Sequence, residues 1–591
     1  MNSNKIKFYL AAAGLLFFGY SCNDYLDKEY DISMSEDQVF GSKENTQGFL
    51  ANIYTNLPDV FAGYTDGQFL GASRDCMTDN AISYWDVHYY HAVLTDGYSA
   101  SNHPLLGFWQ NNLSGIRKAN QFLKNVKAEV VGNTERADDD SKLFERYTSE
   151  AKLLRAIFHF SIVCWFGDAP IIAEDENGVP VVFDLGAPEA MNMSRTNAAD
   201  ALKWIADQCD LVKDDLPFRY SNETENWGRV NGAAAYALKS RALLYRASKL
   251  HNPANNTEYW GEAAQAARDF ISKNNGQSVP YALYSTGNTG NDYYQCFVTN
   301  PVYNNEYILC RSVWRTYDIE LFLAPCGFTG TVTSTGRTNP TQNLVDCYET
   351  INGLPIDQDN TYDPQNPYAN RDPRLEQTIL HQGSMWGDVQ QEERRAVDVS
   401  QPGGADYQAL HGGTLTGYYT KKFLTNMSFK SPSAPNHSCP IFRYGEILLN
   451  AAEAVNEAEG PANAYQYIND LRARVGMPPC ASMTQEQLRD RIRNERRIEL
   501  CFEDHRFFDE RRWMIFEGQS ASAEVGLPYY KQYYNLYGVA VTTPDNPVYT
   551  YVAAQKHPTR TFNSPKNYFF PLPNDEVKRA PNLKQNPGWE L

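Results

Sequence analysis

The residues whose types and spacing most resemble an acid–base site lie between positions 491 and 512. Arginines alternate there with acids, and four of these acids, Glu495, Glu499, Glu503 and Asp509, surround His505 in the sequence. Glycoside hydrolysis needs two carboxylates on opposite sides of a bond, roughly 5–10 Å apart. A helix is expected to run from Thr484 towards Trp513 and to carry all four acids. The segment therefore favours a structural network over a catalytic site.

The spacing of this segment suits ion pairs. Glu503 and Arg506 stand three residues apart, as do Asp509 and Arg512, and such pairs are neighbours on a helix. Arginine beside each acid lowers the pKa of the carboxyl, which is wrong for a general acid. Residues 371–374, with the sequence RDPR, similarly favour a loop held by salt bridges over a ligand site.

Other catalytic signatures are missing from the sequence. It contains no GxSxG, HExxH, Walker A or GxGxxG string, and its ten histidines are scattered. Asp357, Asp359 and Asp363 form an oxygen-rich stretch that is compatible with a structural calcium ion. We therefore expect no catalytic cofactor, and a calcium ion in this loop stays open as an alternative.

Aromatic residues outside helical stripes are the stronger functional signal. The first cluster lies in residues 83–90 and the second begins at Trp314. A flat aromatic ring covers the apolar face of a sugar, and its polar neighbours bond the hydroxyl rim. The candidate ligand-binding residues are Tyr84, Trp85, Tyr89, Tyr90, Trp314 and Tyr317. The alternative, that these rings belong to the core, stays open.

Composition limits the classes of protein that could carry these residues. Of 591 residues, 42% are hydrophobic and 21% charged, which indicates a globular protein with a full core. Lys+Arg 53 against Asp+Glu 71 gives a net charge of −18. This charge argues against binding to nucleic acid phosphates or to an anionic lipid surface.

The N-terminus has the features of an export signal. Lys5 and Lys7 precede a short apolar run, too short to span a bilayer as a helix, and small residues follow before Cys22. Cys22 stands where a bacterial lipoprotein signal has its acylated cysteine, although Gly19 and Tyr20 depart from that pattern. We predict a lipoprotein signal over residues 1–21 and lipidation of Cys22. Ordinary secretion is the alternative.

Periodicity divides the mature chain into helical and loop-rich parts. Helices are expected at 109–126, 143–165, 199–216, 229–248, 259–273, 441–459, 461–475 and from 484. The predicted organisation is a leash at 22–40, a helical part at 41–273, a loop-rich ligand-binding part at 274–439, helical hairpins at 440–517 and a loop-rich part at 518–591. The paired helices of the helical parts suggest a mostly α fold of the tetratricopeptide kind, with short strands in the loop-rich part.

The ten cysteines after Cys22 show no CxxC pair and no zinc-ligand spacing. Cys164, Cys209 and Cys501 fall on apolar helical segments and are expected in the core. Disulfides stay open in an exported chain.

Several strings, in this order, resemble the SusD/RagB family of nutrient-binding lipoproteins of Bacteroidetes. They are SCNDYLD at 21–27, EAKLLRA at 150–156, WFGDAP at 165–170, WGR at 227–229, RDPRL at 371–375, RYGEILL at 443–449, ERRIEL at 495–500, HRFFD at 505–509, YFFPLP at 568–573 and QNPGW at 585–589. The resemblance covers nearly the whole chain.

The resemblance implies a function as well as a fold. Family members have a bundle of tetratricopeptide-like helix pairs that supports a loop-rich part. They lie lipid-anchored on the outer face of the outer membrane. There they bind oligo- or polysaccharide and deliver it to a SusC-type TonB-dependent transporter. Loops after the first helices and in the second part hold their sugar-stacking rings.

The family is one of binding proteins, so no enzymatic activity is expected. Two alternatives stay open at this point. A RagB-like branch takes up peptides on the same scaffold, and a glycoside hydrolase would need a carboxylate pair whose substitution abolishes turnover.

Overall fold

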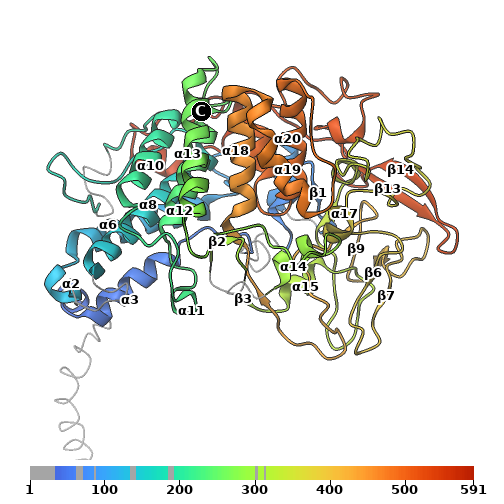
Figure 1. Ribbon diagram of the computed structural model, residues 1–591, viewed down its shortest axis with the longest axis horizontal. Helices are drawn as coiled ribbons and strands as arrows, with labels where there is room; N and C mark the ends of the chain where they lie inside the picture. Colours follow the sequence, from blue (N-terminus) through green and yellow to red (C-terminus); the bar gives the residue numbers. More distant parts are fainter. Residues whose placement is uncertain are drawn as a thin grey trace, which may run out of the picture.

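A run of long helices forms one part of the molecule (Figure 1). The computed structural model describes residues 34–61, 71–85, 88–132, 142–183, 192–299, 304–311 and 314–590. The long helices are α3 (Lys43–Tyr54), α6 (Leu106–Asn125), α8 (Leu143–Phe166), α10 (Ala198–Val212), α12 (Gly232–Ala247), α13 (Thr257–Asn275), α18 (Tyr444–Glu459), α19 (Tyr465–Arg474) and α20 (Gln485–Glu499). In the order α6, α8, α10, α12, α13, α18 and α20, each packs against the next.

Local sequence explains why these helices form and pack closely. The Asn197 side chain accepts a hydrogen bond from the Ala199 N–H at the start of α10, and the Thr484–Gln487 capping box begins α20 as expected. Helix α12 is rich in buried alanine, which lets its neighbours approach. At its start, a Cβ on Gly232 would lie 2.7 Å from the Lys213 carbonyl oxygen, so only glycine fits.

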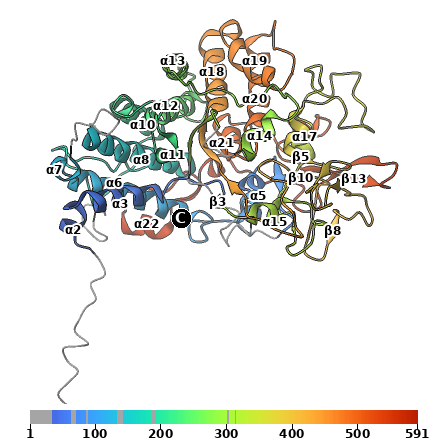
Figure 2. The ribbon, with the colours of Figure 1, turned by 60° about the horizontal axis from the view of Figure 1, so that its bottom comes forward.

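Shorter helices complete the helical content. They are α2 (Glu36–Phe40), α5 (His88–Thr95), α7 (Ala128–Val131), α11 (Glu223–Asn226), α14 (Asp292–Val298), α15 (Asp318–Leu323), α16 (Gln342–Val345), α17 (Arg374–Thr378), α21 (Arg506–Arg512) and α22 (Asn574–Arg579). The 3₁₀ turns within the described ranges are η1 (Arg74–Met77), η4 (Pro461–Asn463), η5 (Tyr529–Lys531) and η6 (Lys566–Tyr568). Near the end of the chain, α22 returns to the N-terminal helices (Figure 2), where the Asn574 N–H donates to the Ala100 carbonyl at 3.1 Å.

The strands of the described chain form antiparallel pairs only. The pairs are β1 (Ala81–Ile82) with β4 (Asn339–Pro340), β2 (Tyr307–Cys310) with β12 (Pro440–Arg443), β3 (Trp314–Arg315) with β11 (Asn436–His437), β5 (Ile379–Leu380) with β10 (Tyr419–Thr420), β6 (Met385–Trp386) with β7 (Arg395–Ala396), β8 (Gln408–Ala409) with β9 (Gly412–Gly413) and β13 (Tyr537–Thr542) with β14 (Val548–Ala553). The predicted fold class, a helical bundle with a loop-rich part that contains short strands, is confirmed.

Two expected helix boundaries are wrong. The helix expected from Ile441 begins at Tyr444, because residues 440–443 pair with β2 as a strand. The helix expected to reach Trp513 ends at Glu499. The backbone of Phe502 and Asp504 is left-handed, with φ of 62° and 63°, which an α-helix cannot contain.

A buried ionic network joins the loop-rich part to α18 and α20. The Glu499 carboxylate accepts from Arg474 at 2.5 Å, Arg443 at 2.8 Å and Arg374 at 3.1 Å. All four side chains are almost fully buried. The surrounding arginines outweigh the effect of burial and lower the pKa of Glu499. A charge buried in this way is stable only while its partners remain.

The ten cysteines of the described chain are free thiols, so the structure places no disulfide among them. Cys209 and Cys501 are buried as expected, and Cys164 is half-buried. None of the helices in the described ranges is long and apolar enough to cross a membrane.

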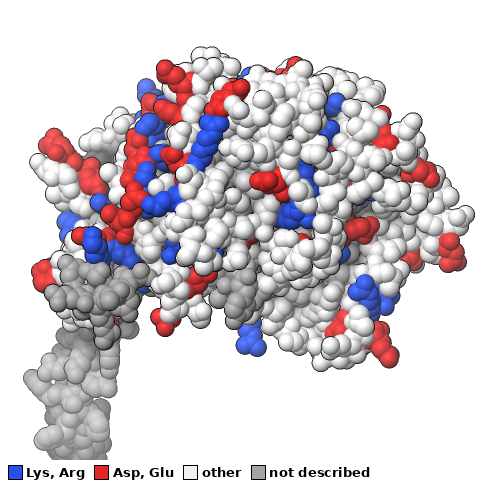
Figure 3. Space-filling model, viewed as in Figure 1, with Lys and Arg blue, Asp and Glu red and all other residues white. Residues whose placement is uncertain are grey.

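Surface charge differs between the two parts of the molecule. Figure 3 shows acidic and basic side chains crowded over α10, α13 and α18, whereas the face over the loop-rich part is largely uncharged. The helical part carries ion pairs between neighbouring helices, for example Lys239 with Asp210 at 2.7 Å and Arg268 with Glu459 at 2.5 Å.

Candidate functional site

Helix α15 brings the two predicted aromatic clusters to one region of the structure. Tyr317 directly precedes α15, and Phe322 lies on it. The Arg337 guanidinium carbon lies 4.1 Å from the centre of the Phe322 ring and 4.6 Å from that of the Trp85 ring. Trp85 and Phe322, more than 200 positions apart in the sequence, therefore flank one guanidinium. We call these three residues, together with their chain neighbours Tyr84 and Tyr317, the α15 surface.

Trp85 has the features of a ligand-stacking ring. It is half-buried and packs against the core, so its position is supported from below. Its indole N–H is buried and finds no hydrogen-bond acceptor among the described residues. Burial also lowers the pKa of Arg337, the cation that stacks on this ring. A buried N–H without a partner costs about 1–3 kcal/mol, so a ligand hydroxyl that accepts from it would be stabilised.

Tyr84 is the chain neighbour of Trp85 but packs against a different cluster of buried residues. The Lys556 ammonium donates to the Tyr84 carbonyl oxygen at 3.2 Å and lies 5.9 Å from the centre of its ring. A Cβ on Gly413 would come within 2.8 Å of the same ring. Glycine at 413 therefore allows strand β9 to approach Tyr84 closely.

The remaining predicted residues have different positions. Tyr90 is fully buried, and its hydroxyl donates to the Ala72 carbonyl at 2.9 Å, which favours the core interpretation for this ring. Tyr89 is half-buried against the core. The Trp314 backbone pairs with His437, while the side chain of Trp314 lies outside the described residues, as does Cys22.

Phe322, Arg337 and Lys556 were missed by the sequence analysis. Arg337 lies in a stretch of Thr, Ser and Gly without periodicity, and Lys556 is more than 450 positions from Tyr84. Neither Arg337 nor Lys556 has a local sequence pattern that predicts which residues it contacts. Only Phe322 carried a signal, because it follows the second aromatic cluster within five residues of Tyr317.

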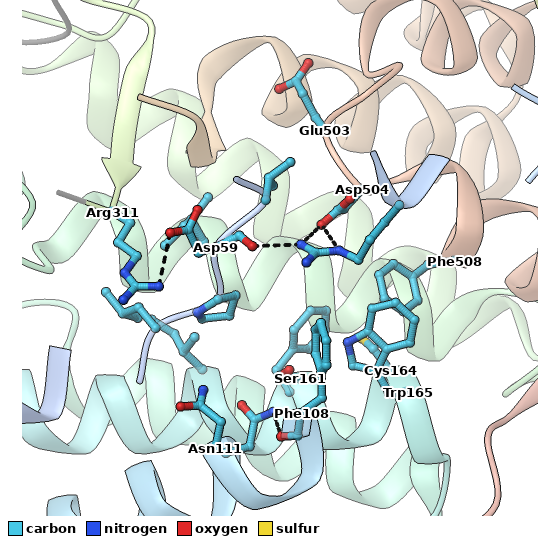
Figure 4. Close-up of a pocket in the computed structure, with 18 of the residues that line it drawn as sticks. Asp59, Phe108, Asn111, Ser161, Cys164, Trp165, Arg311, Glu503, Asp504 and Phe508 are labelled. Atoms are coloured by element: carbon cyan, nitrogen blue, oxygen red, sulfur yellow. Dashed lines mark hydrogen bonds and ion pairs between the residues drawn. The ribbon is translucent and has the colours of Figure 1, made fainter. Parts of the chain in front are cut away.

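A cavity of about 400 Å³ lies between the first helices and strand β12 (Figure 4). Its walls come from residues 55–60, α6, α8, α12, β12 and residues 503–508. Asp59 and Arg311 form an ion pair at 3.1 Å. Arg311, one of the wall residues, lies three positions before Trp314. The cavity wall and the second aromatic cluster are therefore neighbours in sequence.

The walls of this cavity contain polar atoms that other side chains do not satisfy. Arg74 pairs with Asp504, yet Arg74 Nη1, Asp504 Oδ1 and Asn112 Oδ1 are buried without hydrogen-bond partners in the described ranges. For Arg74, burial alone would lower the pKa, but Asp504 outweighs it and the pKa rises. Burial raises the pKa of Asp504, opposed by Arg74. Donors and acceptors together suit water or a hydroxyl-rich ligand.

The acid-rich segment forms structural contacts, with one predicted pair confirmed and one wrong. Asp509 binds Arg512 at 2.8 Å as expected. Glu503 instead binds Arg443 and Lys422, both at 2.7 Å, and Arg506 binds Asp79. The chain breaks between α20 and α21, so Glu503 and Arg506 no longer stand on one helix.

The arginines at 371–374 also have structural partners. Arg374 binds Asp372 at 2.7 Å, while Arg371 donates to the carbonyl oxygens of Val345, Tyr348 and Pro367. The predicted loop clamp is therefore confirmed for Arg374, whereas Arg371 holds the loop through backbone hydrogen bonds.

The oxygen-rich loop proposed for calcium is tied by hydrogen bonds. Asp359 accepts from Thr350, Asn352 and Thr361, and Asp357 accepts from Tyr530. In the described ranges, no group of three or more Asp, Glu, His or Cys side chains is arranged so that it could hold a metal ion.

Comparison with known proteins agrees with this architecture. The sequence model of the SusD family matches residues 278–589, and a second model, described as starch-binding associating with outer membrane, matches residues 24–244. The chain belongs to the SusD family, which confirms the resemblance seen in its motifs. SusD-like protein P25 of Formosa agariphila is 22% identical over 542 residues, 86% of this chain and 90% of the relative.

Solved structures share the fold. A SusD-like protein from Bacteroides fragilis is 24% identical, with a TM-score of 0.74 over 94% of this chain and 99% of its own. A SusD-like carbohydrate binding protein from the same species is 22% identical, with a TM-score of 0.66 over 92% and 100%. The surface glycan-binding protein A from Bacteroides uniformis is 19% identical, with a TM-score of 0.58 over 92% and 99%.

Proposed function

We propose that this protein binds oligo- or polysaccharide at the α15 surface and delivers it to a SusC-type TonB-dependent transporter. The observation that carries the proposal is the convergence of Trp85 and Phe322 on Arg337, next to the start of α15. Family membership supports it, as do the names of two structural relatives, one a carbohydrate binding protein and the other a surface glycan-binding protein.

The chemistry of the α15 surface suits a neutral sugar. Half-buried rings present flat apolar faces, and a buried indole N–H without an acceptor lies beside them. A sugar offers C–H groups to such faces and hydroxyl oxygens to such donors. A binding protein for transport must also release its ligand. We therefore expect a Kd between about 1 μM and 1 mM.

A glycan array on the purified full-length chain tests the ligand class, with mixed peptides as the second arm. Binding to oligosaccharides, and its loss in Trp85→Ala, supports the proposal. Binding to peptides alone favours the RagB-like alternative. Release of reducing sugar by the pure protein would favour a glycoside hydrolase instead.

We propose that Cys22 carries a lipid anchor that holds the protein on the outer face of the outer membrane. Cys22→Ala should leave the fold intact and move the protein from the membrane fraction to the soluble fraction. Accessibility of the wild type to an external protease in intact cells tests which side it faces. A Cys22→Ala variant that stays in the membrane fraction without a transporter would contradict the anchor.

Delivery requires a physical complex with the transporter. Co-purification of a SusC-type transporter from the outer membrane with this chain is the expected result. A chain that binds glycan but never copurifies with a transporter would leave the binding proposal standing and remove the delivery step.

A further inference from the structure

A second and larger cavity, of about 690 Å³, lies beside α20 and away from the α15 surface. Its walls come from residues 346–358, from α20, from residues 513–519 and from the segment around η5. None of its wall residues belongs to the α15 surface or to the walls of the cavity of Figure 4. Sites for small molecules usually have volumes of about 300–1,000 Å³, so this space is large enough for a sugar-sized ligand.

Arg493 is the unusual side chain of this cavity. It is half-buried, and its guanidinium lies 4.9 Å from the centre of the Trp513 ring, which also lines the cavity. Its Nε is buried, and the side chain makes no hydrogen bond or ion pair with any residue in the described ranges. A guanidinium has five N–H donors and normally binds acceptors when it loses contact with water.

The acids nearest to Arg493 are already occupied. Glu453 accepts two hydrogen bonds from Arg512, both at 2.6 Å, and Glu457 accepts two from Arg489, also at 2.6 Å. Both act on Arg493 electrostatically without bonding to it. Burial lowers the pKa of Arg493, because moving a cation out of water costs free energy when no anion pairs with it.

Other charges in the wall leave a positive surplus. Arg497 and Arg506 share one carboxylate, Asp79, at 3.3 and 2.7 Å. Arg491 shares Glu349 with Arg472 in the same way.

Lys531 adds a further cation, with its ammonium 5.4 Å from the centre of the Tyr530 ring. The wall also contains two acids that could oppose an anion, Asp490 and Asp346. Asp490 is exposed to solvent. Burial raises the pKa of Asp346 to about 6, which reduces the charge it keeps in the folded protein.

We propose that this cavity is a second binding site, selective for a sugar-sized ligand that carries a carboxylate or sulfate group. The anionic group binds the Arg493 guanidinium, and Lys531 contributes a second positive charge at the solvent side. Tyr530, which is half-buried, supplies a flat face for the ring of the ligand, and the Trp513 ring supports the Arg493 guanidinium. The site is independent of the neutral-sugar site at the α15 surface.

Calorimetric titration of the full-length chain with D-glucuronate, D-glucose 6-sulfate and D-glucose tests the proposal. We expect at least one anion to bind with a Kd of about 1 mM, the affinity that ligand efficiency allows at this size. D-glucose should bind this site at least about tenfold more weakly, because it lacks the charge-assisted hydrogen bond. Binding should weaken as salt rises.

Variants locate the site. Arg493→Gln should weaken anion binding by about tenfold or more, and Lys531→Gln by less, since Lys531 is exposed. Arg268→Gln is the matched control, because it removes the same charge from α13, outside the cavity wall, and leaves Glu453 and Glu457 paired. Arg493 makes no bond to the described protein, so its substitution should leave thermal melting unchanged.

Three results would overturn the proposal. They are no binding of either anion, equal binding by Arg493→Gln and wild type, and equal loss in Arg268→Gln. Loss of anion binding in Trp85→Ala but not in Arg493→Gln would place the anion at the α15 surface instead. Failure of this site leaves the neutral-sugar proposal intact, because the array and the Trp85→Ala variant test that proposal separately.

Discussion

The α20–α21 segment and the α15 surface differ in whether their side-chain groups already have partners within the protein. Around α20 and α21, acids and arginines are buried and bind one another, as Glu499 does with three arginines. At the α15 surface, rings are half-buried and the Trp85 N–H has no acceptor among the described residues. The segment richest in reactive residue types is therefore structural, while the sparser aromatic group remains open to a ligand.

The same contrast extends over the two parts of the molecule. Ion pairs between neighbouring helices occupy the surface of the helical part, whereas the loop-rich part exposes few charges on the face shown in Figure 3. A largely uncharged surface suits a neutral ligand. Arg493 is an exception within the helical part, because its charge lacks a partner in the described ranges.

The largest effect is expected from removing a partner in the buried network. Arg506 makes two hydrogen bonds to Asp79, at 2.8 and 2.7 Å. Arg506→Ala should lower the free energy of unfolding by roughly 3–5 kcal/mol, because it leaves a buried carboxylate with fewer partners. Thermal melting measures the loss, and glycan affinity of the folded fraction should not change.

Arg219→Ala is the control for this variant, because Arg219 pairs with Glu223 nearer the surface. It should change stability by about 0–1 kcal/mol. Unchanged melting of Arg506→Ala together with abolished binding would reverse the contrast between the two regions.

Asp346 is an exception to the pattern that the buried acids of this protein form ion pairs. It is buried, accepts from Gln342 at 2.6 Å, and has no ion pair within the described ranges. Burial raises its pKa to about 6. The unfolded chain has a lower pKa, so the folded state binds the proton more tightly and stability rises as pH falls through about 6 towards 4. Asp346→Asn should therefore stabilise the protein at pH 7.5 by up to about 3 kcal/mol.

Melting temperatures at pH 7.5 and pH 4.5 measure this effect. The advantage of Asp346→Asn should shrink at the lower pH, where the wild-type carboxyl is already protonated in the folded state. An advantage that is equal at both pH values would exclude titration of Asp346 as its cause.

At the α15 surface, substitution should change affinity more than stability. Trp85→Ala should weaken glycan binding by about 1–3 kcal/mol, by analogy with bases that stack on aromatic side chains. Trp109→Ala is the comparison, because Trp109 is buried and should cost about 3–5 kcal/mol of stability. Calorimetry and melting on both variants separate the roles. Normal affinity of Trp85→Ala for the cognate glycan would remove this ring from the site.

The smallest effect belongs to the exposed charges of the helical part. Lys203 pairs with Asp207 one turn away on α10, and both side chains are well exposed. Lys203→Ala should change stability by only about 0.3–0.5 kcal/mol. Chemical denaturation gives the value. A loss comparable with that of Arg506→Ala would show that exposure does not separate the two kinds of ion pair.

Much of the fold could be predicted because it depends on local patterns. The Thr484–Gln487 capping box, the C-terminal Gly167 of α8 and the apolar stripe of α10 lie within a few residues of the structure that they specify. The break after Glu499 could not be predicted in this way. It depends on Asp75, whose carboxylate accepts from the Phe502 N–H across 427 positions.

Part of the candidate site could also be predicted, because it depends on a local pattern in the sequence. Trp85 and Tyr317 stand out because aromatic residues cluster in loops. The residues that complete the site, Phe322 and Arg337, take their roles from contacts across the fold. Tyr90 belongs to the same cluster as Trp85, yet it is in the core. Spacing alone does not separate the two, because Trp85 lies before α5 whereas Tyr90 lies on it.

The sequence by itself determined the family, the helical class and the two places where rings gather, because motifs, helix caps and composition act over short distances. Tertiary structure decided which charges neutralise one another and which side chains remain available. Arg506 binds Asp79 across 427 positions, while Arg493, on the helix just before it, has no such partner in the described chain. Electrostatic pairing and burial depend on distances through space, and a one-dimensional pattern does not contain them.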